Sequence, residues 1–167
     1  MQMPLVRFQP RDLNVAVHVR RGDVDDWVPG RGTSHEYYVW LINIMRRKVP
    51  YAKFHIFSEQ RRRSNNTDEF DPYSKLGATV NLDTEATETL AHFARADVLV
   101  TAKSSFSYAA ALLNPHCVLY QRWMLAVPGW VPLPKSEHLG NDATEMLSQQ
   151  IGSCMLSIAA RKYGGQE

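Results

Sequence analysis

The stretch Val15-Ala16-Val17-His18-Val19-Arg20-Arg21-Gly22-Asp23 carries the strongest fold signal in this sequence. Its first five residues are apolar apart from His18, which predicts a buried strand over 15–19. Two arginines follow at once, and guanidinium groups beside a core are costly unless an anion or a carboxylate partners them. Gly22 permits a sharp turn and the close approach of a ligand. The stretch therefore predicts a buried strand that ends in a polar turn able to bind an anion.

Strands and helices are expected to alternate along the rest of the chain. The pattern predicts further strands over 53–58, 78–82, 97–102 and 117–120, and helices over 34–48, 84–96, 104–113 and 144–163. Ser34 and Asp142 are plausible helix caps, 59–73 reads as a loop or a poorly formed helix, and the Pro-rich 127–134 as a loop. The alternation predicts a single α/β domain over 1–167, a three-layer Rossmann-like fold with a mainly parallel sheet of about five strands.

Composition narrows the classes of function. The chain has 167 residues, 44% hydrophobic and 22% charged, and a formal net charge of +2, which suits one globular domain and predicts no nucleic-acid partner. The basic runs 46–48 and 61–63 read as solvated faces. No apolar stretch approaches the ~20 residues of a membrane span. The polar start predicts no signal peptide, so any membrane anchor is expected outside this chain.

The two cysteines, Cys117 and Cys154, are far apart in the sequence and predict neither a disulfide framework nor a zinc site. Cys117 lies in an apolar run and is expected in the core. His55 and His92 are expected to be structural histidines. The sequence holds no Gly-x-Gly-x-x-Gly or phosphate-loop pattern and no order of residues typical of a hydrolase triad.

Polar residues follow the predicted strands, at the edge where parallel sheets bind ligands. They are Arg20 to Asp23, Ser58-Glu59, Asp83, and Lys103 to Ser107. On physical grounds alone, Arg20 and Arg21 could equally bind phosphate or pair with nearby carboxylates. The serines after the fourth strand could form an anion site at a helix start or simply cap that helix. We expect both arginines to project towards Ser104-Ser105.

Two weaker patterns overlap the first polar turn. The Asp-x-Asp spacing of Asp23 and Asp25 could hold a divalent ion that bridges a diphosphate, but so short a pattern arises often by chance. The tripeptide 21–23 is an Arg-Gly-Asp sequence, yet it abuts a buried strand rather than an exposed loop. Neither pattern predicts a function by itself.

Two motifs of this chain resemble those of the α-1,2- and α-1,6-fucosyltransferases. Residues 18–23 resemble their His-x-Arg-Arg-Gly-Asp motif, and 96–110 resemble their later motif, in which an apolar strand leads into Ser-Ser-Phe-Ser and a helix. Phe57-Ser58-Glu59 resembles the Ser-Asp-Asp at the end of their second strand, and 114–115 and 121–123 continue the similarity. The resemblance covers roughly 14–123.

The resemblance implies the GDP-fucose-binding, C-terminal domain of a GT-B glycosyltransferase, with the N-terminal domain absent from this chain. It implies that Arg20 and Arg21 hold the donor diphosphate beside Gly22, and that His18 lies near the nucleotide. Ser104, Ser105 and Phe106 are implied as further donor contacts, and Ser58 and Glu59 take the place of the Ser-Asp-Asp. An ungapped match puts Thr89 where the family has an Asp that contacts the nucleotide. The family uses no metal ion and no cofactor besides the donor substrate.

The expected reaction is inverting transfer of fucose from GDP-fucose to a glycan hydroxyl. Arg20 or Arg21 would stabilise the leaving diphosphate, and a base, with Asp23 as a candidate, would deprotonate the acceptor. A missing N-terminal domain or a second copy of the chain would complete the site. The compartment stays open, being the Golgi or another secretory compartment for a eukaryotic protein and the cytoplasm for a bacterial one. Two alternatives remain: a non-catalytic or truncated nucleotide- or glycan-binding module, and a metal-dependent transferase that uses Asp23 and Asp25.

Overall fold

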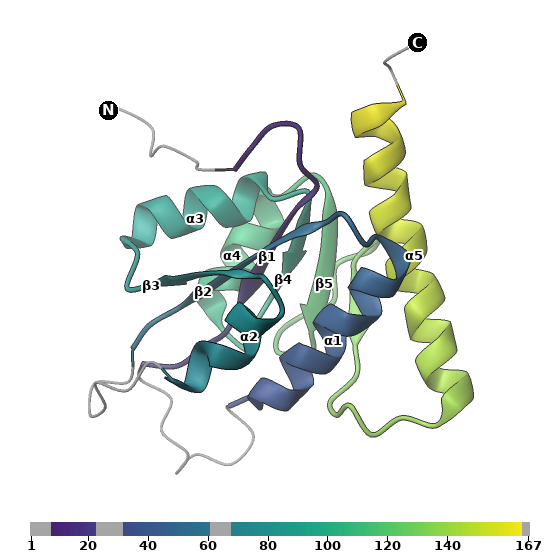
Figure 1. The fold of residues 1–167 in the computed structure, drawn as a ribbon, viewed down its shortest axis with the longest axis horizontal. Helices are drawn as coiled ribbons and strands as arrows, with labels where there is room; N and C mark the ends of the chain where they lie inside the picture. Colours follow the sequence, from purple (N-terminus) through teal and green to yellow (C-terminus); the bar gives the residue numbers. More distant parts are fainter. Residues whose placement is uncertain (1–7, 23–31, 61–67, 165–167) are drawn as a thin grey trace.

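The computed structural model describes residues 8–22, 32–60 and 68–164 of the chain (Figure 1). In this part, six strands form one parallel sheet in the order β3-β2-β1-β4-β5-β6. This is the strand order of the doubly wound Rossmann fold, in which the direction of winding reverses between β1 and β4. The predicted α/β, Rossmann-like class is therefore confirmed, with one strand more than expected.

The elements are short and close to the predicted ranges. The strands are β1 (Asn14–His18), β2 (Lys53–Ser58), β3 (Thr79–Leu82), β4 (Val98–Val100), β5 (Cys117–Gln121) and β6 (Val131–Leu133). The helices are α1 (His35–Lys48), α2 (Asp71–Lys75), α3 (Ala86–Arg95), α4 (Ser105–Leu113) and α5 (Asn141–Tyr163), with a 3-10 turn η1 (Asp68–Phe70) before α2.

Strand β6 lies in the segment that the sequence predicts to be a loop, and that prediction was wrong. The proline-rich composition favours a loop because Pro132 donates no backbone hydrogen bond. β6 is an edge strand that pairs with β5 alone in the described sheet. An edge strand tolerates proline because one of its sides needs no donor.

The helix starts follow local capping chemistry. The side chain of Ser34 accepts a hydrogen bond of 3.1 Å from the backbone N–H of Tyr37, which confirms it as the cap of α1. The cap of α5 is Gly140 instead of Asp142, which lies inside the first turn. There its negative charge still favours the positive end of the helix dipole.

The helices cover both faces of the sheet (Figure 1). Val15 and Val17 of β1 belong to the cluster that packs α1 and α5 against the sheet, whereas Ala16 belongs to the cluster under α3 and α4. Successive residues of a strand point to opposite faces, so a strand covered on both sides is apolar throughout. This explains the unbroken apolar run before His18.

A disulfide joins Cys117 of β5 to Cys154 of α5, with their Cα atoms 5.7 Å apart. The prediction from the sequence, which suggested no disulfide, was therefore wrong. The two cysteines meet only because α5 returns across the sheet, 37 residues after β5 begins. Cys117 is 2% exposed, which confirms its expected place in the core. In the described ranges, no helix is long and apolar enough to span a membrane.

Candidate functional site

A cavity of about 440 Å³ lies beyond the carboxyl ends of β1, β2 and β3, against α3 and α4. Its lining residues are His18, Phe57, Ser58, Glu59, Asn81, Asp83, Thr84, Ala86, Thr89 and Phe106. Half of these are residues that were predicted from the sequence as donor-site residues, in separate segments: His18, Ser58, Glu59, Thr89 and Phe106. The fold brings them to one place at the expected edge of the sheet, and their contact with a ligand stays a prediction.

Part of this lining was missed by the sequence analysis. Asn81 comes from β3, and its side-chain amide donates to the backbone oxygen of Ile56 at 3.1 Å. Asp83 was noted at a strand end but not assigned to the site. The position of β3 could have indicated both residues, because parallel strands that are neighbours in a sheet end at the same edge.

His18 sits between the cavity and the aromatic cluster under α3 and α4. Its ring centroid lies 5.3 Å from that of Phe93 and 6.1 Å from that of Phe106. Burial lowers the pKa of His18 to about 3, and the charge of Arg20 contributes to the same shift. Its buried Nδ1 has no hydrogen-bond partner among the described residues. The imidazole is therefore neutral at physiological pH and has one buried nitrogen to be satisfied by water or a ligand.

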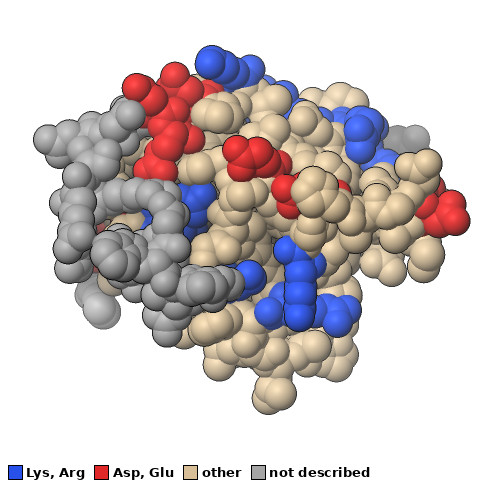
Figure 2. Space-filling model, turned by 90° about the horizontal axis from the view of Figure 1, so that it is seen from below, with Lys and Arg blue, Asp and Glu red and all other residues tan. Residues whose placement is uncertain are grey.

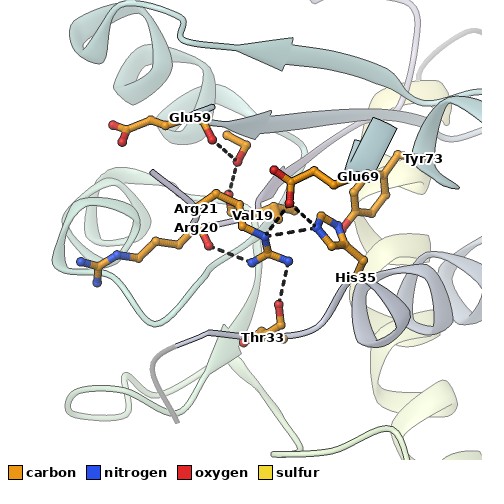
Figure 3. Close-up of polar contacts among 9 residues, drawn as sticks. Val19, Arg20, Arg21, Thr33, His35, Glu59, Glu69 and Tyr73 are labelled. Carbon is orange, nitrogen blue, oxygen red and sulfur yellow. Dashed lines mark hydrogen bonds and ion pairs between the residues drawn. The ribbon is translucent and has the colours of Figure 1, made fainter. Parts of the chain in front are cut away.

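Arg20 extends towards the turn that follows β4. Its Nη1 donates a hydrogen bond of 3.0 Å to the backbone oxygen of Lys103, which comes just before α4. Figure 3 shows its side chain pointing away from that of Arg21. Arg20 thus joins the two turns on either side of the point where the sheet reverses its winding, as expected from the sequence.

Arg21 points in the other direction, so the expectation that both arginines project towards Ser104 was wrong for Arg21. It is 5% exposed, and its guanidinium donates to the backbone oxygens of Arg20 at 2.9 Å and Thr33 at 3.1 Å. Its Nε lies 3.8 Å from a carboxylate oxygen of Glu69 (Figure 3). The two neighbouring arginines therefore have different partners in the structure.

The partners of Arg21 form a polar cluster between α1 and α2. His35 Nε2 lies 3.2 Å from both Arg21 Nε and Glu69 Oε2, and His35 Nδ1 lies 2.8 Å from the hydroxyl of Tyr73 (Figure 3). Burial, followed by the charge of Arg21, lowers the pKa of His35, while Glu69 raises it. Burial also raises the pKa of Tyr73 well above its usual range. This cluster ties the turn after β1 to the start of α1.

Two of the three predicted serine ligands, Ser104 and Ser58, form hydrogen bonds with backbone groups. Ser104 is buried and its hydroxyl accepts from the N–H of Phe106 at 3.3 Å, so it caps α4. Ser58 donates to the backbone oxygen of Val19 at 2.6 Å. Ser105 is exposed at the first position of α4. A ligand at this turn would meet the backbone N–H groups of the helix start together with the Ser105 side chain.

Gly22 lies directly beneath Glu59. Its φ of 66° falls in the left-handed region, and an added Cβ would lie 2.2 Å from Glu59 Oε2. Glycine is therefore favoured both by the backbone and by the carboxylate that packs over it. The exposed side chain of Glu59 thus lies over the turn after β1, at the rim of the cavity.

Charge changes sign along this edge of the sheet. Carboxylates of Asp83 and Glu59 follow β3 and β2, whereas Arg20 and Lys103 follow β1 and β4. Figure 2 views the molecule from below and shows both acidic and basic side chains on that face. A ligand lying along the edge would meet acceptors at one end and cations at the other.

Asp23, the candidate base, and Asp25, its partner in the possible metal pair, both lie outside the described residues. Within the described ranges, no group of three or more His, Cys, Asp or Glu residues is arranged to hold a metal ion.

No protein-family model and no curated protein sequence matches this chain. Among solved structures, it resembles a point mutant of S. aureus TarM in complex with fondaparinux, alpha-GlcNAc-glycerol and UDP, with a TM-score of 0.48 and 15% sequence identity. The match covers 98% of this chain and 35% of the TarM chain, so this chain spans only about a third of that protein. A likeness this distant says nothing about what this chain binds.

Proposed function

We propose that this chain is the donor-binding domain of a fucosyltransferase-like glycosyltransferase and that it binds GDP-fucose. One observation carries the proposal: a single cavity at the carboxyl edge of a Rossmann-type sheet is lined by residues of both motifs that resemble the family. His18 comes from the first motif and Phe106 from the second. Arg20 adds a positive charge beside the cavity, where the diphosphate would lie.

We propose different roles for the two arginines. Arg20 lies against the Lys103 turn and the start of α4, so the diphosphate would be bound by its guanidinium and by the N–H groups of that helix. Arg21 is buried among protein acceptors. It is a positioning residue that fixes the turn from which Arg20 projects.

The proposed chemistry is an inverting displacement at fucose C1. The acceptor oxygen forms a bond to C1 as the bond between C1 and the diphosphate oxygen breaks, and GDP leaves with the electron pair. The cation of Arg20 stabilises the negative charge that develops on the diphosphate. The acceptor proton passes to a base, for which Asp23 remains the candidate in this chain.

Binding of the glycan acceptor needs a second protein surface opposite the donor site. An N-terminal domain, or a second copy of this chain, would hold the glycan across the carboxyl edge of the sheet. Most of the rate gain in a two-substrate reaction comes from fixing both reactants in one geometry. The isolated chain would therefore bind the nucleotide but transfer fucose poorly.

Isothermal titration calorimetry with GDP, GDP-fucose and UDP tests the proposal. Wild type and an Arg161→Ala control, altered at an exposed position of α5, should bind the guanine nucleotides alike. Arg20→Ala should bind them at least about tenfold more weakly, because a hydrogen bond to a charged group contributes about 1.5–3 kcal/mol. Absence of guanine-nucleotide binding by wild type, or equal binding by Arg20→Ala and the control, would count against the proposal.

A further inference from the structure

The cavity beyond β1, β2 and β3 has an unusual polarity for a nucleotide site. None of its ten described lining residues is Lys or Arg, and Asp83 and Glu59 contribute two carboxylates. Its walls also include the aromatic rings of Phe57 and Phe106. Carboxylates repel phosphate and accept hydrogen bonds, so this lining suits a flat group that is rich in hydrogen-bond donors.

Asp83 is an exposed residue at the β3 end of the cavity, and two hydrogen bonds anchor it there. The N–H of Asp83 donates to the backbone oxygen of Ser58 at 3.0 Å, and its Oδ1 accepts from the N–H of Gln60 at 3.0 Å. Its φ of 52° places it in the left-handed region, which Asp and Asn enter more readily than most residues. Asp83 also belongs to the lining of the cavity.

We infer that Asp83 reads the base of the bound nucleotide and selects guanine. This inference rests on the proposed function and adds the residue that decides between nucleotides. Guanine presents two adjacent donors, N1–H and the N2 amino group, on one edge, and a carboxylate can accept both. Uracil has a single donor between two acceptors, and adenine has an amino group beside an acceptor, so neither matches a carboxylate in this way.

The spacing of the strands supports this orientation. β3 is two strands from β1 and three from β4, which at about 4.8 Å per strand gives roughly 10 to 14 Å between the ends of the site. An extended nucleoside diphosphate spans a comparable distance. With the base at Asp83, its phosphates reach Arg20. Glu59 then follows β2, the position from which an acidic residue binds ribose hydroxyls in dinucleotide-binding Rossmann domains.

The sharpest test exchanges guanine for xanthine, which carries an oxygen in place of the N2 amino group. Asp83→Asn replaces one acceptor by a donor and suits the left-handed backbone, so the fold should be retained. In calorimetry, Asp83→Asn should bind GDP about tenfold or more weakly than wild type does. Its preference between the two nucleotides should move towards xanthosine diphosphate. Glu59→Gln is the matched control, and it should weaken both nucleotides without changing their ratio.

A second measurement needs no variant. Inosine diphosphate lacks only the N2 amino group of GDP, and wild type should bind it about tenfold more weakly because one acceptor of Asp83 loses its partner. Equal affinities for GDP and inosine diphosphate, or a ratio of GDP to xanthosine diphosphate that Asp83→Asn leaves unchanged, would overturn the role of Asp83 alone. A change in the ratio of GDP to xanthosine diphosphate affinity in Glu59→Gln, instead of in Asp83→Asn, would also overturn the role of Asp83. If wild type binds none of these nucleotides, the proposed function itself fails.

Discussion

The guanidinium of Arg20 and the backbone oxygen of Lys103 are joined by a hydrogen bond of 3.0 Å, and this contact connects the turns after β1 and β4. The two strands are neighbours in the sheet although 83 residues separate the two partners. The contact places a cation at the reversal point of the sheet, where Rossmann folds bind phosphates. The proposed donor site depends on this one relationship more than on any other.

Arg20→Ala and Arg21→Ala should affect different properties: the first should mainly weaken nucleotide binding, and the second should mainly lower stability. Arg21→Ala should lower the free energy of unfolding by about 1–3 kcal/mol, because it removes buried hydrogen bonds to two backbone oxygens. Arg20→Ala should mainly weaken GDP binding. Urea denaturation together with calorimetry separates the two effects. If Arg21→Ala is fully stable and loses GDP binding, Arg21 is a ligand residue and its assignment as a positioning residue is wrong.

Gly22→Ala should reduce both stability and nucleotide affinity. Alanine at a φ of 66° is strained by about 1–2 kcal/mol, and its Cβ would displace the carboxylate of Glu59. Gly129→Ala is the control, since Gly129 has a φ of 88° and open space around it. Both variants should lower the unfolding midpoint in urea. A drop in GDP affinity of similar size in both would show that the Gly22 turn has no special part in binding.

Removing the disulfide should destabilise the fold. Cys154→Ser opens a loop of 37 residues, and closing a loop of this size in the unfolded chain is worth about 2–4 kcal/mol. Denaturant unfolding of wild type with and without a reducing agent provides the comparison, because reduction should lower the wild type to the level of Cys154→Ser. Identical unfolding curves in all cases would contradict a stabilising bond between β5 and α5.

His18 should contribute to loss of stability in acid. Its pKa is about 3 in the folded chain and about 6.5 when unfolded, so between these values the unfolded chain binds a proton that the folded chain does not. Stability should therefore fall as pH decreases from 6.5 towards 3, by at most about 1.4 kcal/mol per pH unit from this group. His18→Gln should show a shallower decline in urea unfolding across that range. An equal slope in both proteins would mean that His18 titrates normally in the fold.

Local signals in the sequence were enough for most of the fold and for part of the site. The apolar run before His18 and the cap at Ser34 predicted a strand and a helix start where the structure has them. The rule that parallel strands end at one edge brought together Ser58, Glu59 and Phe106, whereas His18 was assigned through the family resemblance. These features depend on neighbours in the sequence and on the general topology of α/β sheets.

The remaining features depend on contacts between distant segments. The direction of Arg21 is set by Thr33 and Glu69, and nothing in the motif itself distinguishes it from Arg20. The disulfide partner of Cys117 is decided by the path of α5. Asp83 was noted among the polar residues at this edge, but its left-handed backbone and its hydrogen bond with Gln60 have no sequence pattern of their own.

A crystal structure of the chain grown with GDP would show directly whether this cavity and Arg20 bind the nucleotide. We predict the guanine base in the cavity beside Asp83 and the diphosphate within hydrogen-bond distance of the Arg20 guanidinium, while Arg21 keeps its contact with Thr33. Nucleotide density at another surface, or a diphosphate held by Arg21 with Arg20 turned away, would contradict it.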